Sequence, residues 1–155
     1  MRKLGTHALA AKAIRVELKK LFPTVKFSVT SQTYSMGDSV RIDWTDGVTT
    51  DQVNVIVRKY QYGSFDGMTD SYNYTNNRND IPQAKYVQCQ RSYSDAAQEE
   101  LLEEVRNAYQ GFNEITDIDQ SSKELFDAYD CWTVRNFLYR ILVKRDLTSR
   151  GIKCT

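Results

Sequence analysis

The chain has 155 residues, of which 41% are hydrophobic and 26% charged, and its formal net charge is +1. A chain of this length can bury about two thirds of its unfolded surface in one domain without a disulfide or a metal. With only two prolines and seven glycines it is unsuited to long disordered linkers, and no apolar run reaches the roughly 18 residues of a membrane span. We expect one domain over residues 1–155, in the cytoplasm and without membrane contact.

The N-terminal stretch predicts an amphipathic helix. Its apolar residues recur every three or four positions, with lysines and arginines between them, up to Pro23. Proline disfavours helical geometry in the residue before it, so the helix should end there. The predicted core-facing residues are Leu9, Ala10, Ala13, Ile14, Leu18 and Leu21.

A β-hairpin and a second helix are predicted next. Residues 25–34 and 40–44 alternate apolar and polar side chains, which is typical of two strands with one buried face. Thr49 and Gln52 then have the spacing of a helix capping box. We expect the apolar members of the alternation to face helices, namely Val25, Phe27, Val29, Val40, Ile42 and Trp44.

The second half of the chain predicts one more strand and a helical end. Residues 84–93 alternate again, and Ser94 can cap a helix that ends near Gly111. Ser121 can cap a last helical region that is broken near Asp130, where the apolar phase shifts. The predicted class is α+β, in the order α-β-β-α-(loop or short β)-β-α-α. The small sheet is expected to be antiparallel and covered by helices, with residues 94–155 forming a helical C-terminal part.

Charge is distributed in blocks along the chain. Residues 1–26 carry seven Lys/Arg and one Glu, residues 95–130 carry eleven Asp/Glu and two Lys/Arg, and residues 131–155 carry six basic residues and one acidic residue. Such blocks predict solvated helix faces that pair with each other. An alternative is a basic face, made by the two termini, that contacts phosphate.

No catalytic or metal-binding motif is present in the sequence. Cys89, Cys131 and Cys154 form no CxxC pair, and His7 is the only histidine. We therefore predict structural cysteines, no metal and no cofactor, with a Cys89–Cys131 disulfide left open as an alternative. An enzyme of unrecognised class stays open as an alternative, and its reacting groups would come from Asp43, Asp66, Asp70, Tyr72, Arg78 and Arg91.

The segment from residue 60 to 80, YQYGSFDGMTDSYNYTNNRND, fits neither a helix nor a buried strand. It holds four tyrosines, three aspartates and two glycines. We predict an ordered, turn-rich, partly extended segment packed along the strand 84–93. Phe65 should point inward, and at least two of Tyr62, Tyr72 and Tyr74 should be exposed on one surface.

Three sequence blocks carry a family resemblance. KKLFPTVKFSV, then VRIDWTDG followed by TTDQV, then YGSFDGMTDSYNY resemble the large polyvalent protein associated domain family number twenty-nine, over roughly residues 8–93. Where that family has Gly-Pro-Thr before its second helix, this chain has Val48, which removes only a rigid helix entry. The resemblance implies a phage or plasmid protein acting in the bacterial cytoplasm, with a small α+β fold. It implies no reaction.

Two binding hypotheses follow. In the first, the protein is a non-catalytic accessory protein that binds a host protein or nucleoprotein complex, as an anti-defence inhibitor for example. Its partner patch would comprise Tyr62, Phe65, Asp66, Met68, Asp70, Tyr72 and Tyr74. In the alternative, tyrosines stack on nucleic-acid bases and cations neutralise phosphates. Those cations would be Lys12, Arg15, Lys19, Arg78, Lys85 and Arg91.

Overall fold

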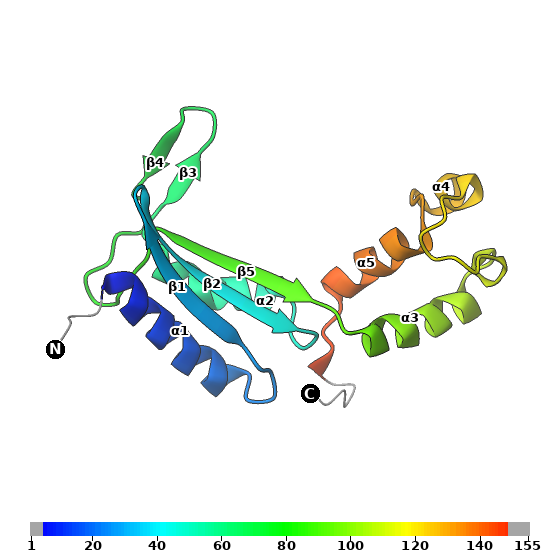
Figure 1. The fold of residues 1–155 in the computed structure, drawn as a ribbon, viewed down its shortest axis with the longest axis horizontal. Coiled ribbons are helices and arrows are strands. Elements are labelled where there is room, and N and C mark those ends of the chain that lie inside the picture. The colour runs from blue at the N-terminus through cyan, green and yellow to red at the C-terminus, as the bar shows by residue number, and fades with distance from the viewer. Residues whose placement is uncertain (1–4, 149–155) are drawn as a thin grey trace.

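A computed structural model describes residues 5–148, in an α+β fold with the predicted order of elements (Figure 1). The elements of the first half are α1 (Thr6–Leu21), β1 (Ser28–Tyr34), β2 (Gly37–Thr45), α2 (Thr50–Val57), the 3-10 turn η1 (Arg58–Tyr60), β3 (Ser64–Asp66) and β4 (Ser71–Asn73). Those of the second half are β5 (Tyr86–Ser92), α3 (Asp95–Ala108), the 3-10 turn η2 (Phe112–Glu114), α4 (Lys123–Tyr129) and α5 (Val134–Lys144).

The main sheet has three strands in the order β1-β2-β5. Strands β1 and β2 form the predicted antiparallel hairpin, but β5 lies parallel to β2, with Ile42 opposite Cys89. The prediction of an antiparallel sheet is therefore wrong for this pair. Helix α2 and the segment after it return the chain to the end of the sheet where β2 began, and such a crossover makes the next strand parallel.

One face of this sheet is covered by α1 and α2, and the other face is open to solvent. The alternating residues predicted to face helices form the core: Val40 and Ile42 are 0% exposed and Trp44 is 3% exposed. Phe27 is half-buried, with its ring 5.5 Å from that of Trp44. The polar residues of the alternation, among them Arg41 and Gln90, lie on the open face. The period-two pattern thus correctly assigned the buried side.

Helix α1 buries a narrower stripe than its sequence predicts. Ala10, Ala11, Ile14 and Leu18 face the sheet and are buried. Leu9 and Leu21, which were expected in the core, are 40% and 49% exposed. The main sheet covers the stripe of α1 that carries Ala10, Ile14 and Leu18, and Leu9 lies beside that stripe. Leu21 is in line with the stripe, seven positions after Ile14, but it is the last residue of the helix.

The C-terminal helices enclose a second core beyond the end of β5 (Figure 1). The second core contains the buried residues Leu101, Val105, Phe112, Leu138 and Leu142, among others. Ser94 caps α3 as predicted, while α4 is capped by Ser122 and not by Ser121. Helix α4 ends at Asp130, whose φ of 55° is left-handed, which confirms the predicted break.

Arg91 and Asp46 join the two cores. The Arg91 guanidinium donates hydrogen bonds to the backbone carbonyls of Asp46, Gly47, Leu142 and Arg145, at 2.8 to 3.0 Å. The buried Asp46 carboxylate accepts a hydrogen bond from the Ser94 amide, 2.9 Å away, at the start of α3. One side chain from the sheet and one from the turn after β2 therefore fix the position of the helical part.

The two described cysteines, Cys89 and Cys131, are free thiols. Burial raises the pKa of Cys89 to about 11, so this thiol is unreactive at neutral pH. Cys154 and the end of the basic C-terminal block lie outside the described residues. Within residues 5–148, no helix has the length and apolar character needed to cross a membrane.

Candidate functional site

The tyrosine-rich segment forms a short hairpin, β3–β4, that projects from one end of the main sheet (Figure 1). Its turn is stabilised by its own polar residues: the Asp66 carboxylate accepts a hydrogen bond from the Met68 amide, at 2.9 Å, and Asp70 has a φ of 49°. The hydrogen bond to the Met68 amide holds the pKa of Asp66 below its ordinary value. Both aspartates thus shape the turn, as turn residues do, while their charges stay in solvent.

Four rings at the base of the hairpin form a tyrosine cluster, defined as Tyr62, Tyr72, Tyr74 and Tyr86. The Tyr72 ring lies at its centre, 5.8, 5.2 and 5.6 Å from the rings of the other three in that order. The edge-to-face angles are those that aromatic pairs favour. The cluster connects the hairpin to the first residue of β5 and so fixes the direction in which the hairpin projects.

Lys85 completes the tyrosine cluster. The Tyr72 hydroxyl donates a hydrogen bond to the Lys85 carbonyl, at 2.5 Å, and the Lys85 ammonium lies 5.1 Å from the centre of the Tyr72 ring. Burial, together with the neighbouring tyrosines, raises the pKa of Tyr72 to about 12. The hydroxyl therefore remains a protonated donor at any physiological pH.

Gly63 allows the hairpin to approach its own base. A Cβ atom at this position would lie 2.2 Å from the Asn73 carbonyl oxygen and 2.4 Å from Cε1 of Tyr72. Such distances are far shorter than any van der Waals contact, so a side chain here would push β4 and the Tyr72 ring away. Glycine is used at this position for close packing, and not for an unusual backbone conformation.

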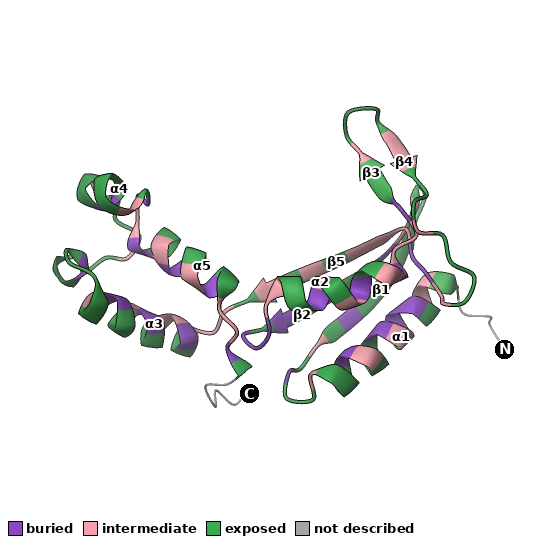
Figure 2. Ribbon diagram, turned by 180° about the vertical axis from the view of Figure 1, so that it is seen from behind, coloured by how far each residue is buried: buried purple, intermediate pink, exposed green. Residues whose placement is uncertain are grey.

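Two apolar side chains on the outer part of the hairpin and one at its base are exposed. Met68 is 95% exposed, Tyr74 is 66% exposed and Phe65 is 54% exposed. Neither strand of the hairpin contains a buried residue (Figure 2). The prediction that Phe65 points inward is wrong, because the hairpin rises from the sheet and has no core to face.

Two of the three tyrosines predicted to be exposed are more buried than expected. Tyr62 and Tyr72 are half-buried in the tyrosine cluster, so only Tyr74 of the three is exposed. The expected exposed surface is present, but it is made by Phe65, Met68 and Tyr74. The rings that were expected outside instead form the support of the hairpin.

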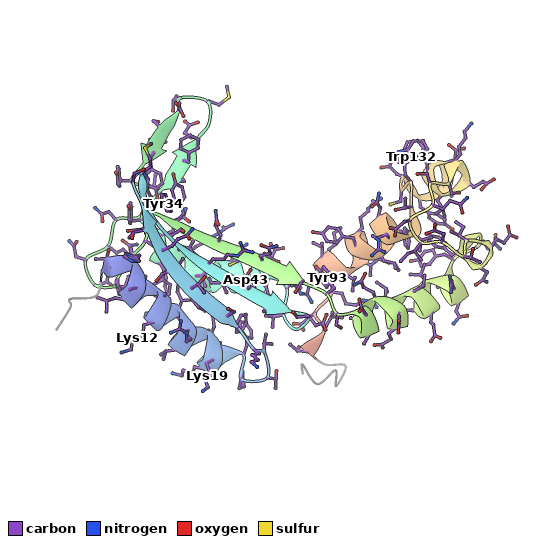
Figure 3. All side chains as sticks on the ribbon, in the orientation of Figure 1. Lys12, Lys19, Tyr34, Asp43, Tyr93 and Trp132 are labelled. Carbon is purple, nitrogen blue, oxygen red and sulfur yellow. The ribbon has the colours of Figure 1, made fainter. Side chains whose placement is uncertain are left out.

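The six cations proposed for nucleic acid do not share one surface. Four of them have partners within the protein: Arg15 with the Val29 carbonyl, Arg78 with Asp80, Lys85 with the Met36 carbonyl, and Arg91 with the four carbonyls described above. Lys12 and Lys19 lie on the outer side of α1, away from the sheet (Figure 3). A continuous basic path over the tyrosines is therefore not formed by these residues.

The residues considered for catalysis are also spread out. Asp43 is paired with Arg41 on the open face of the sheet, Asp66 caps the hairpin turn, and Arg91 lies at the joint between the cores. Among residues 5–148, no three His, Cys, Asp or Glu side chains are placed to hold a metal ion.

Sequence reasoning missed the apolar residues on the outer side of α1. Leu9, Val16 and Leu21 are exposed beside a groove that runs along the helix. The sequence did indicate them, because the apolar residues of this helix span more of its circumference than one buried stripe needs.

Comparison with known proteins gives one match. The family described as Large polyvalent protein associated domain 29 matches residues 6–94, which include the main sheet, the hairpin and the tyrosine cluster. Helices α3 to α5 lie outside the match. No curated protein and no solved structure matches the chain.

Proposed function

The chain belongs to the large polyvalent protein associated domain 29 family, which is associated with mobile genetic elements, and on this premise we propose that it binds a host protein. The binding surface is the exposed apolar side of the β3–β4 hairpin, with Phe65 and Met68 on its outer part and Tyr74 at its base as anchors. The observation that carries the proposal is the exposure of these three side chains on a hairpin held rigidly at its base.

The exposed part of an apolar side chain adds nothing to the stability of the fold. Met68 is 95% exposed and has lost almost no apolar surface to the folded protein. Aromatic residues and methionine are enriched in protein–protein interfaces, where a few such anchors supply most of the binding energy. A partner that covers Met68 would gain about 1.5–3 kcal/mol from that side chain, and roughly half as much from Phe65, which is 54% exposed.

The tyrosine cluster supports binding by preorganisation. Its rings and the hydrogen bond from Tyr72 to the Lys85 carbonyl hold the hairpin in one orientation before the partner arrives. A preformed binding element loses less conformational entropy on association than a mobile loop. Asp66 and Asp70, at the hairpin turn, add negative charge beside the apolar anchors and favour a partner with basic residues at the matching position.

Within the cell, this binding would take place in the cytoplasm of a bacterium that carries the phage or plasmid. An accessory protein without a catalytic set acts by occupying a surface, so we propose that it blocks a host complex, such as one used in defence against the incoming element. Nucleic-acid binding is the weaker alternative, because four of its six candidate cations have partners within the protein.

Site-specific photo-crosslinking in bacterial cells tests the proposal. A photoreactive phenylalanine analogue at position 68 should give one discrete host-protein adduct. The same analogue at Val55 is the matched control, since that residue is 77% exposed and belongs to α2 and not to the hairpin. Phe65→Asp with Met68→Asp should abolish copurification of the captured protein and change the melting temperature by less than about 2 °C. No adduct at position 68, or the same adduct at both positions, would refute the proposal.

A further inference from the structure

A second surface lies along α1, next to the base of the hairpin. A groove of about 1140 Å³ runs between this helix and the loop 77–83. In Figure 1 the loop lies beside the N-terminal part of α1, at the same end of the molecule as the hairpin. The groove is lined by Leu9, Ala13, Val16 and Leu21 from the helix, Ile81 and Pro82 from the loop, and charged residues at its margins.

The helix side of the groove is apolar and uncovered. Val16 is 64% exposed, and Leu9 and Leu21 are 40% and 49% exposed. Leu9 and Val16 are seven positions apart, which places them on one face of the helix two turns from each other. This face is distinct from the buried stripe of Ala10, Ile14 and Leu18. Helix α1 therefore has two apolar faces, one covered by the sheet and one open.

The loop side of the groove is held in place by a buried amide. Gln83 is 6% exposed, and its side chain donates to the carbonyls of Lys59 and Asn76, at 2.7 and 2.8 Å. It also accepts a hydrogen bond, at 2.8 Å, from the amide of Arg78. With every hydrogen-bonding group of this amide engaged, the wall of the groove is fixed before any ligand enters.

After the charged residues that form ion pairs are set aside, the remaining charge of the groove is positive. The Glu17 carboxylate accepts hydrogen bonds from Lys59 and from the Tyr60 hydroxyl, at 2.6 and 2.7 Å. Burial tends to raise the pKa of Glu17, but these partners outweigh it and lower the pKa, so the carboxylate stays ionised and paired. Arg78 is paired with Asp80. The remaining charged lining residues are Lys12 and Lys20, both exposed on α1.

We propose that this groove binds an acidic amphipathic helix of a partner protein. The exposed apolar row on α1 would receive the apolar stripe of that helix, and Lys12 and Lys20 would pair with carboxylates on its flanks. The volume exceeds the roughly 300–1,000 Å³ of small-molecule sites, and its apolar lining is unsuited to a phosphate backbone. The acidic helix α3 of a second copy is also unsuited, since Leu101 and Val105 are buried in its own core.

Peptide binding measured by fluorescence anisotropy tests this proposal. The probe is a labelled peptide of about 15 residues, with leucines at every third or fourth position and glutamates on both flanks. It should bind with a dissociation constant in the micromolar range. Two control peptides should not bind: one with the same composition in scrambled order, and one with lysines in place of the glutamates.

Matched variants locate the binding to the groove. Val16→Glu and Lys12→Glu should each weaken binding at least about tenfold. Val55→Glu controls for the first change, and Lys26→Glu makes the same charge change outside the groove. Both control variants should bind like the unmodified protein. The Phe65→Asp/Met68→Asp variant should also bind normally, so this test is independent of the function proposed for the hairpin.

Five results would overturn the proposal, and four of them concern the peptide. They are no binding of the acidic peptide, equal binding of the scrambled peptide, unchanged binding by Val16→Glu, and displacement of the peptide by a single-stranded oligonucleotide of similar length. Concentration-dependent self-association that Val16→Glu abolishes would assign the groove to a second copy, and would also overturn it. Circular dichroism and thermal unfolding confirm that each variant is folded before it is assayed.

Discussion

Replacing Arg91 by alanine should weaken the joint between the two cores of the protein. Its guanidinium donates to four backbone carbonyls, two in the turn after β2 and two at the end of the C-terminal helical part. Alanine removes all four hydrogen bonds together and leaves a space that only water can fill. No described ion pair crosses the same joint, so the loss falls on the link between the cores.

The size of the effect follows from the hydrogen bonds that are lost. A hydrogen bond to a charged group contributes about 1.5–3 kcal/mol, but Arg91 is half-buried and water can reach some of the freed carbonyls. We therefore use about 1 kcal/mol for each of the four bonds, which gives a loss of about 4 kcal/mol. That loss is a large part of the roughly 5–15 kcal/mol by which a domain is stable. Arg91→Lys should recover a small fraction, because an ammonium cannot reach carbonyls on both sides of the joint.

Urea unfolding measures how much stability the Arg91→Ala variant loses, and hydrogen exchange shows which of the two cores is affected. Tryptophan fluorescence gives the free energy of unfolding, since Trp44 is 3% exposed in the first core. Hydrogen exchange resolved by peptide should show α5 losing more protection than β2 in the Arg91→Ala variant. In the unmodified protein we expect both elements to exchange through one common unfolding event, as in a single domain.

Arg41→Ala is the matched control. Arg41 lies on the open face of the sheet, 53% exposed, in a surface ion pair with Asp43 that is expected to contribute less than about 1 kcal/mol. If Arg91→Ala costs no more than Arg41→Ala, or if α5 and β2 lose protection equally, then Arg91 does not join the cores and the reasoning is refuted.

Substitutions at three further positions test the groove and the tyrosine cluster. Gly63→Ala should destabilise the protein by about 2 kcal/mol or more in urea, because the added Cβ would overlap the neighbouring strand, and a loss below about 0.5 kcal/mol would contradict this. Tyr72→Phe, which keeps the ring and removes only its hydrogen bond, should cost about 1 kcal/mol and Tyr72→Ala about three times as much. Tyr60→Phe should cost about 1 kcal/mol at pH 7, and less as the pH falls below 4.5, the ordinary pKa of glutamate. The sign follows from Glu17. Its pKa is lowered in the folded protein, so its ion pair stabilises the fold above pH 4.5 and is lost as the pH falls through the lowered pKa. A cost of Tyr60→Phe that does not decrease anywhere below pH 4.5 would contradict the assignment.

Local patterns in the sequence determined much of the first half of the fold. Alternation predicted the buried side of β1 and β2, down to Val40 and Trp44, because successive side chains of a strand point to opposite faces. Thr49 and Ser94 were identified as caps because capping depends on residues within one turn of the helix. The three sequence blocks also identified the family.

Which distant segments of the chain contact each other was determined only by the tertiary structure. Nothing local distinguishes a parallel from an antiparallel neighbour for β5, since both need the same alternation. The candidate patch was found from its composition, but the exposure of Phe65 and the half-burial of Tyr72 depend on how far the hairpin rises from the sheet. Arg91 was assigned to phosphate because a lone arginine in a strand carries no sign of the four carbonyls, three of them more than 44 residues away, that it contacts. A sequence records which groups can bind, and only the folded chain determines which of them already have a partner.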